Sequence, residues 1–137
     1  MLMCTYKLAN LLLCIFLTAL ENAIVELDHS EHVRKVISLK RSRAGHLSEI
    51  SKIYKQLDSF LLDYEFFRKV QILDEKLKSQ WMKYSSINDQ LQLLIPEDSE
   101  KDYVMQHSNN YRHYVTMIKE YICEAEKYFK ELRESDL

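Results

Sequence analysis

The side chains that could do chemistry here are histidines, cysteines and a short acidic run, and their spacing predicts no metal site. His29 and His32 are three residues apart and could share a helix face, but no third ligand lies at a convincing spacing for zinc. His107 lies among apolar positions, which favours a core histidine over a ligand. The acidic run Glu97, Asp98, Glu100 and Asp102 lacks the glycine of a calcium loop, so we interpret it as the electrostatics of a helix start.

Catalytic signatures are missing as well. The sequence has no nucleophile elbow, no zinc-protease helix motif, no phosphate-binding glycine loop and no zinc knuckle. Trp81 and the nine tyrosines could stack on bases, but most of them fall on apolar stripes, where core packing explains them better. We therefore expect a protein with no enzymatic activity, no cofactor and no small-molecule substrate.

The cysteines indicate the redox compartment, and the net charge limits the kinds of partner. Cys4, Cys14 and Cys123 are widely separated and odd in number, which predicts neither a disulfide framework nor a zinc site. If the N-terminus were removed, Cys123 alone would remain, and one unpaired thiol suits a reducing compartment. The formal net charge of −2 provides no overall field that would attract nucleic acid, so a partner must be recognised by a local patch.

One basic cluster is a candidate contact patch. It lies in residues 28–46 and consists of Arg34, Lys35, Lys40, Arg41 and Arg43. Such a cluster can contact nucleic acid or an acidic membrane, and it can equally be the polar face of a first helix. The lack of interleaved aromatic residues favours the second interpretation, and nucleic acid stays the weaker partner class.

The elements that must position these residues are long helices. With one glycine and one proline in 137 residues, the chain has few places for tight turns or helix ends. Apolar residues recur at helical spacing along three stretches, so we predict an all-α fold with helices over about 30–62, 66–95 and 98–134. Short links make consecutive helices antiparallel neighbours in a bundle or coiled-coil-like arrangement.

Each predicted helix has its own apolar seam, with steps of three and four residues. The first seam is Leu47, Ile50, Tyr54, Leu57, Leu61 and Tyr64. The second is Val70, Leu73, Leu77, Trp81, Tyr84, Ile87, Leu91 and Leu94. The third is Val104, His107, Tyr111, Tyr114, Ile118, Tyr121, Ala125, Tyr128 and Leu132. We predict a largely buried Trp81, a break near residues 59–65 with Asp63 as helix cap, and a stop at Pro96.

Residues 1–27 form an apolar N-terminal segment ahead of a helical domain at 28–137. Lys7 precedes thirteen largely apolar residues, Leu8 to Leu20, which is the layout of a signal peptide and is too short to span a bilayer. The cleavage site is poor, because Ala19 has Leu17 and Ala23 has Glu21 at the third position before the cut. The alternatives are a buried helix or the product of an unusual upstream exon.

Two segments carry a family resemblance. Lys40 to Ile50 reads K-R-S-R-A-G-H-L-S-E-I, and Leu77 to Leu91 reads L-K-S-Q-W-M-K-Y-S-S-I-N-D-Q-L around Trp81. Together with the turn at Pro96 and the aromatic third helix, they resemble the Gag-like helical domain of BEL/Pao-type retrotransposons over residues 33–130. The resemblance implies a structural segment that assembles particles through helix packing, here as a fragment or domesticated remnant. Three-helix spectrin-like repeats share the length and the mid-helix tryptophan.

Two functions therefore stay open. One is a cytoplasmic Gag-like assembly module, and the other is a small secreted helical protein that acts by surface recognition. We expect residues 28–137 to associate with themselves or with a partner helix, because apolar columns widen the first and last helices beyond a narrow seam. The residues expected at that interface are Ile53, Phe60, Met117, Ile122 and Phe129.

Overall fold

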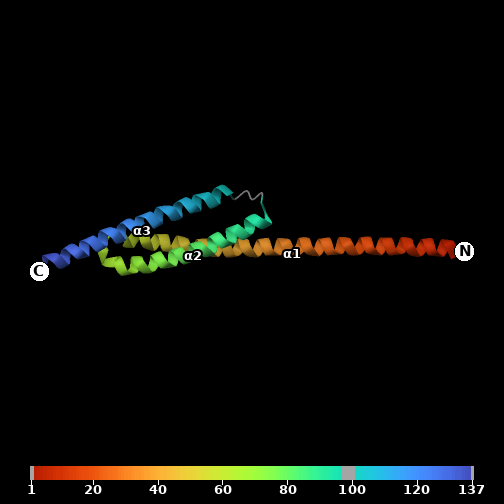
Figure 1. Cartoon of the computed structure of the whole chain (residues 1–137), viewed down its shortest axis with the longest axis horizontal. Coiled ribbons are helices and arrows are strands. Elements are labelled where there is room, and N and C mark those ends of the chain that lie inside the picture. The colour runs from red at the N-terminus through yellow and green to blue at the C-terminus, as the bar shows by residue number, and fades with distance from the viewer. Residues whose placement is uncertain (1, 97–100, 137) are drawn as a thin grey trace. The chain divides into compact units, whose positions relative to one another are not determined.

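The chain is helical in three long elements. The computed structural model describes the backbone of residues 2–96 and 101–136, and the side chains of 4–96 and 103–136. Helix α1 spans Leu2–Phe60, a short 3-10 helix η1 spans Tyr64–Phe66, α2 spans Phe67–Leu94 and α3 spans Lys101–Ser135 (Figure 1). The described residues contain no strand, so the predicted all-α class with three helices is confirmed.

The chain divides into two compact units, Met1–Ser38 and Leu39–Leu137. The boundary expected between residues 27 and 28 falls inside the first unit. The first helix also begins much earlier than the predicted residue 30, because α1 is helical from Leu2. Residues 2–44 contain no glycine or proline that would interrupt it.

In the second unit, α2 runs antiparallel to the end of α1. Arg43 on α1 bonds to Asn88 on α2, and His46 further along α1 bonds to Gln80 earlier on α2. Residue numbers therefore rise on one helix while they fall on the other. The direction follows from the short connection after Phe60, which turns the chain back on itself.

Helix α3 in turn runs antiparallel to α2. Phe67 at the start of α2 contacts Phe129 near the end of α3, and Trp81 contacts Tyr111. In Figure 1 the two helices lie side by side with opposite directions. The second unit is thus an antiparallel three-helix bundle, as the seams predicted.

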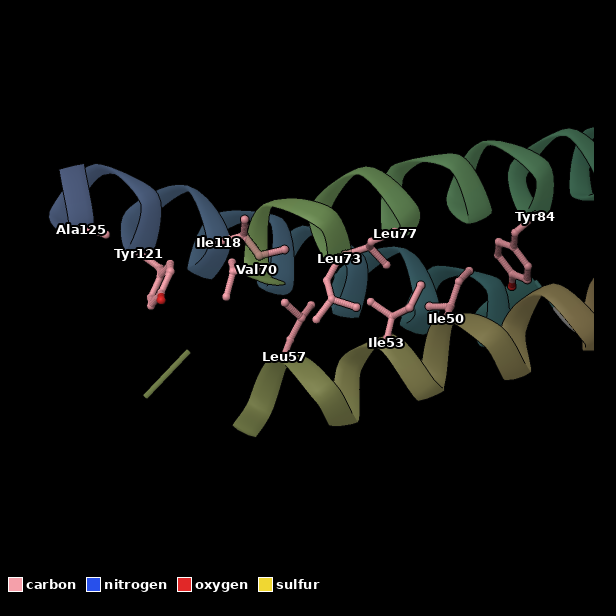
Figure 2. Packing of buried hydrophobic residues seen from close by; sticks show 10 residues of the cluster. All are labelled: Ile50, Ile53, Leu57, Val70, Leu73, Leu77, Tyr84, Ile118, Tyr121 and Ala125. Atoms are coloured by element: carbon pink, nitrogen blue, oxygen red, sulfur yellow. The ribbon is translucent and has the colours of Figure 1, made fainter. Parts of the chain in front are cut away.

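The core of this bundle is built from the predicted seams of all three helices and from Ile53 beside the first seam. Its buried cluster consists of Ile50, Ile53, Leu57, Val70, Leu73, Leu77, Tyr84, Ile118, Tyr121 and Ala125. Figure 2 shows the side chains of α1 and α2 pointing toward one another in this layer. Burying a Leu, Ile or Val side chain contributes about 1.5–3 kcal/mol relative to leaving it exposed, so the seams hold the bundle together.

Trp81 lies at the edge of this core. Its indole is partly buried and stacks on Tyr111, with ring centroids 4.3 Å apart and planes 6° from parallel. A tryptophan is large enough that one edge often stays in contact with solvent. It contributes to packing from α2, as its place on the seam predicted.

The turn between α1 and α2 is ordered by Asp63. This residue is extended, with φ −143° and ψ 138°, and its carboxylate accepts a hydrogen bond of 2.9 Å from the backbone N–H of Glu65. The predicted break is confirmed, and Asp63 is a cap as predicted, although α2 itself has Phe66 at its N-cap position with no side-chain hydrogen bond. The cap acts on η1, which leads directly into α2 at Phe67.

The predicted stop at Pro96 is confirmed too. Helix α2 ends at Leu94, and Ile95 leaves the helical region with φ −135° and ψ 75°. The ring of a proline disfavours helical backbone in the residue before it, which accounts for the position of this end. The acidic residues Glu97, Asp98 and Glu100 lie outside the described residues, as does the side chain of Asp102.

The N-terminal part of α1 has an unusual surface. All side chains from residue 4 to residue 35 are exposed, including those of Leu11, Leu12 and Leu13. By length and composition this helix could cross a membrane, although an N-terminal signal sequence meets the same criteria. The thirteen residues Leu8 to Leu20 are too few to span by themselves, but the helix that contains them continues beyond Glu21 through the apolar residues Ala23, Ile24 and Val25.

Candidate functional site

The expected interface residues lie in different environments. Ile53 is only 6% exposed and points into the core (Figure 2). It therefore contributes no exposed apolar surface to an interface. The three-helix core buries this second apolar column of α1 in addition to the seam, because α1 packs against two helices. Phe60, Ile122 and Phe129 are half-buried at the edge of the core. Met117 on α3 is half-buried and lines a depression together with residues of the α1–α2 turn.

An open apolar surface lies where α2 begins and α3 ends. Phe67 and Phe129 meet edge to face with centroids 5.7 Å apart, and together with Gln71 and Leu132 they line a shallow groove. Leu132 is 45% exposed. Because α2 begins at Phe67, which already pairs with Phe129, α2 has no residue that could cover the following turn of α3.

This surface continues along the two helices. Gln71 also lines a second depression with Ile72 and Ile122, so the two depressions share a wall. Ile72 is 46% exposed. We call the whole patch the α2–α3 surface, defined by its apolar members Phe67, Ile72, Ile122, Phe129 and Leu132.

Charged side chains of both signs line the same depressions. Arg68 and Arg133 are cationic, whereas Glu75, Glu126 and Asp136 are anionic. An apolar centre with a mixed polar rim is the usual composition of a protein interface. Phe129 and Ile122 were expected here from the sequence, whereas Phe67, Ile72 and Leu132 were not.

Tyrosines of the first and third seams stack on one another in the bundle. Tyr54 and Tyr114 stack with centroids 4.0 Å apart and planes 8° from parallel, and the Tyr114 hydroxyl donates a 2.8 Å hydrogen bond to Asp58. Burial, followed by that bond, raises the pKa of Tyr114 to about 12, and burial also raises the pKa of Tyr54. Both phenols stay protonated at neutral pH, so they act as packing groups and not as bases.

His107 is held neutral among aromatic rings. It lies edge-on to Tyr103 at 4.2 Å and to Tyr84 at 6.1 Å, and burial followed by the charge of Arg43 lowers its pKa. Its Nε2 atom has no hydrogen-bond partner among the described residues. This environment fits the core histidine that the seam predicted.

The remaining candidate ligands do not come together. His29 and His32 are exposed on the N-terminal part of α1, and Cys4, Cys14 and Cys123 are exposed free thiols. Over the residues that the structure describes, no group of three or more His, Cys, Asp or Glu side chains could hold a metal ion.

The basic cluster is divided between the two units. Arg34 and Lys35 are exposed in the first unit, and Arg41 is exposed in the second. Lys40 and Arg43 are half-buried, and the Arg43 guanidinium donates a 3.1 Å hydrogen bond to the Asn88 side chain. Part of the cluster therefore joins α1 to α2, which fits the interpretation of a helix face.

No protein-family model, curated protein or solved structure matches this chain. The resemblance to BEL/Pao Gag-like domains therefore depends on the sequence features alone: the two motif segments, the turn at Pro96 and the aromatic third helix.

Proposed function

We propose that residues 39–137 form a non-catalytic helical module that acts by protein–protein association through the α2–α3 surface. The observation that carries this proposal is the exposed apolar patch at the uncovered end of α3. Leu132 and Ile72 are each nearly half exposed beside the half-buried rings of Phe67 and Phe129. Contiguous apolar surface of this kind usually marks an interaction site.

The charges around the patch favour a second copy of the chain as partner. A two-fold symmetric dimer brings the same patch of both subunits together, so each charged group needs an opposite charge on the same surface. Arg133 lies in the last turn of α3 and Asp136 directly follows this helix, and Arg68 and Glu75 line the neighbouring depression on α2. The surface carries both halves of the ion pairs that such a dimer would form.

The Gag-like resemblance supports the same kind of mechanism. It implies a structural role in which helices pack into assemblies, without catalysis or a cofactor. An assembly module of this class would act in the cytoplasm, where the exposed thiol of Cys123 would stay reduced.

Sedimentation of residues 28–137 from low to high micromolar concentration tests the proposal. We expect a dimer or larger species, and we expect the pair Ile72→Glu and Leu132→Glu to weaken association at least tenfold, since two charges would be buried in an apolar contact. Met82→Glu and Leu93→Glu are matched controls, because these residues are 72% and 84% exposed and lie outside the surface. A strictly monomeric parent protein would contradict self-assembly.

A secreted protein acting by surface recognition is the second candidate. The N-terminal apolar stretch favours it, because a signal sequence has the same composition. N-terminal sequencing of protein from its native cells separates the candidates. A start near Ala19–Ile24 supports secretion, whereas an intact Met1 excludes it.

Nucleic acid is the weakest partner class. Its support is the basic cluster, in which Arg43 is already engaged with Asn88. Binding that does not weaken between about 50 and 200 mM salt would argue against this partner, since phosphate contacts release counterions.

A further inference from the structure

Over residues 8–25, helix α1 is apolar around about two thirds of its circumference, and the polar side chains of Asn10, Thr18, Glu21 and Asn22 fall within the remaining third. Leu11, Leu12 and Leu13 follow one another, and successive residues of a helix point about 100° apart, so these three alone cover most of the circumference. All three are more than half exposed. A partner helix would cover one narrow stripe and leave the rest of this apolar circumference in water, whereas the hydrocarbon of a bilayer would cover all of it.

The length of this segment fits a bilayer. Residues 8–25 number 18, which gives about 27 Å of helix at 1.5 Å per residue, close to the roughly 30 Å of hydrocarbon in a membrane. Their one charged residue, Glu21, lies about 6 Å from the end at Val25. Thr18 donates its hydroxyl to the Cys14 carbonyl at 2.9 Å, so this polar group is satisfied within the helix.

We infer that residues 8–25 span a lipid bilayer as an uncleaved anchor, with the module of residues 39–137 on the cytoplasmic side. The orientation follows from lysine and arginine alone, because acidic residues contribute little to it. Five basic residues lie within 18 positions after Val25, whereas residues 1–7 carry Lys7: the five are Arg34, Lys35, Lys40, Arg41 and Arg43. The more basic flank stays in the cytoplasm.

Two further features distinguish an anchor from a cleaved leader. The apolar region of a signal peptide covers 7–15 residues and is followed by small residues at the cleavage site. Here the apolar helix is longer, and Leu17 and Glu21 occupy the positions that need small side chains ahead of Ala19 and Ala23. The exposed free thiol of Cys123 is also consistent with a cytoplasmic location.

Translation of the full chain in the presence of microsomes tests this inference. The chain has no N-x-[ST] sequon of its own, so one acceptor tag added before Met1 and another after Leu137 report the location of each end. We expect a full-length product that resists alkaline carbonate extraction, with the N-terminal tag glycosylated and the C-terminal tag unmodified. A shortened product, a glycosylated C-terminal tag or complete release by carbonate would each overturn the inference.

One set of variants tests the membrane integration of residues 8–25, and a second set tests the orientation. Phe16→Arg should lower the ratio of integrated to released chain about a hundredfold, because residue 16 lies at the middle of residues 8–25 and a central arginine strongly opposes insertion. Val33→Arg on the same helix is the matched control and should leave the ratio unchanged. Replacing Arg34, Lys35 and Arg41 with glutamine should increase the share of chains with a glycosylated C-terminal tag, and an unchanged share would contradict the assigned orientation.

Discussion

At the residue scale, the stacked tyrosines show how this core tolerates polar atoms. Tyr114 directs its hydroxyl to Asp58, whereas the hydroxyl of its stacking partner Tyr54 is buried without a hydrogen-bond partner among the described residues. An unsatisfied buried hydroxyl has lost its hydration without compensation. The ring of Tyr54 stabilises the bundle, and its oxygen opposes that stabilisation.

Replacing Tyr54 with phenylalanine should therefore raise the free energy of unfolding by about 1 kcal/mol, since the ring remains and the unsatisfied hydroxyl is removed. Urea unfolding followed by circular dichroism measures the change. Tyr114→Phe is the matched control and should lower the same free energy by about 1 kcal/mol, because it removes the hydrogen bond from the Tyr114 hydroxyl to Asp58. A clear loss of stability in Tyr54→Phe would show that the hydroxyl has a partner.

At the element scale, the reversal between α1 and α2 depends on one residue that serves two helices. The Asp63 side chain caps η1 through the N–H of Glu65, and its backbone carbonyl accepts a 2.6 Å hydrogen bond from the hydroxyl of Tyr121 on α3. The same residue thus ends the turn locally and attaches it to the third helix. This arrangement sets the point at which α2 starts, and with it the length of α3 that stays uncovered.

Asp63→Ala should lower the free energy of unfolding by about 1 kcal/mol, because the backbone donor of Glu65 loses its acceptor. Asp63→Asn should cost only a few tenths of that, since asparagine caps about as well as aspartate. Chemical denaturation of the two variants beside the parent protein measures the difference. Equal losses in both would mean that the carboxylate charge, and not the cap, is what stabilises the turn.

At the scale of the whole molecule, the bundle is held by a core unusually rich in phenols. Burial is the first cause of the raised pKa of Tyr54, Tyr111, Tyr114 and Tyr121. These residues come from α1 and α3, so their ionisation is linked to the packing of the bundle. The surfaces outside this core, the α2–α3 surface and the apolar helix of residues 8–25, are the ones to which we assign partners.

The bundle should lose stability in alkali between about pH 10 and pH 12. Tyrosines of the unfolded chain release protons near pH 10, whereas folded Tyr114 holds its proton up to about pH 12. In this window the unfolded state binds fewer protons, so the free energy of unfolding falls as pH rises.

Thermal unfolding at a series of pH values, with tyrosinate absorbance recorded in parallel, measures this loss. The Tyr54→Phe variant has one fewer tyrosine with a raised pKa, so its free energy of unfolding should fall less steeply with pH than that of the parent protein. A melting temperature that stays level through the window would contradict a linkage between these phenols and folding.

The sequence by itself determined the local features of this protein. The scarcity of glycine and proline, the three seams, the Asp63 cap and the end before Pro96 all depend on neighbours within a few residues, so they could be predicted without the fold. The start of α1 could not, because an apolar segment ahead of a bundle can form a separate element or continue the next helix, and local spacing does not distinguish the two.

The tertiary structure alone decided which apolar residues are covered. Ile53 and Phe129 both widen a seam, yet Ile53 is buried in the core and Phe129 stays at its edge. Tyr128 and Leu132 continue the third seam without a fault in spacing, yet both are more than 40% exposed. Periodicity describes one helix at a time, whereas burial also requires that a second helix reach the same level, and α2 begins too late to cover the last turns of α3.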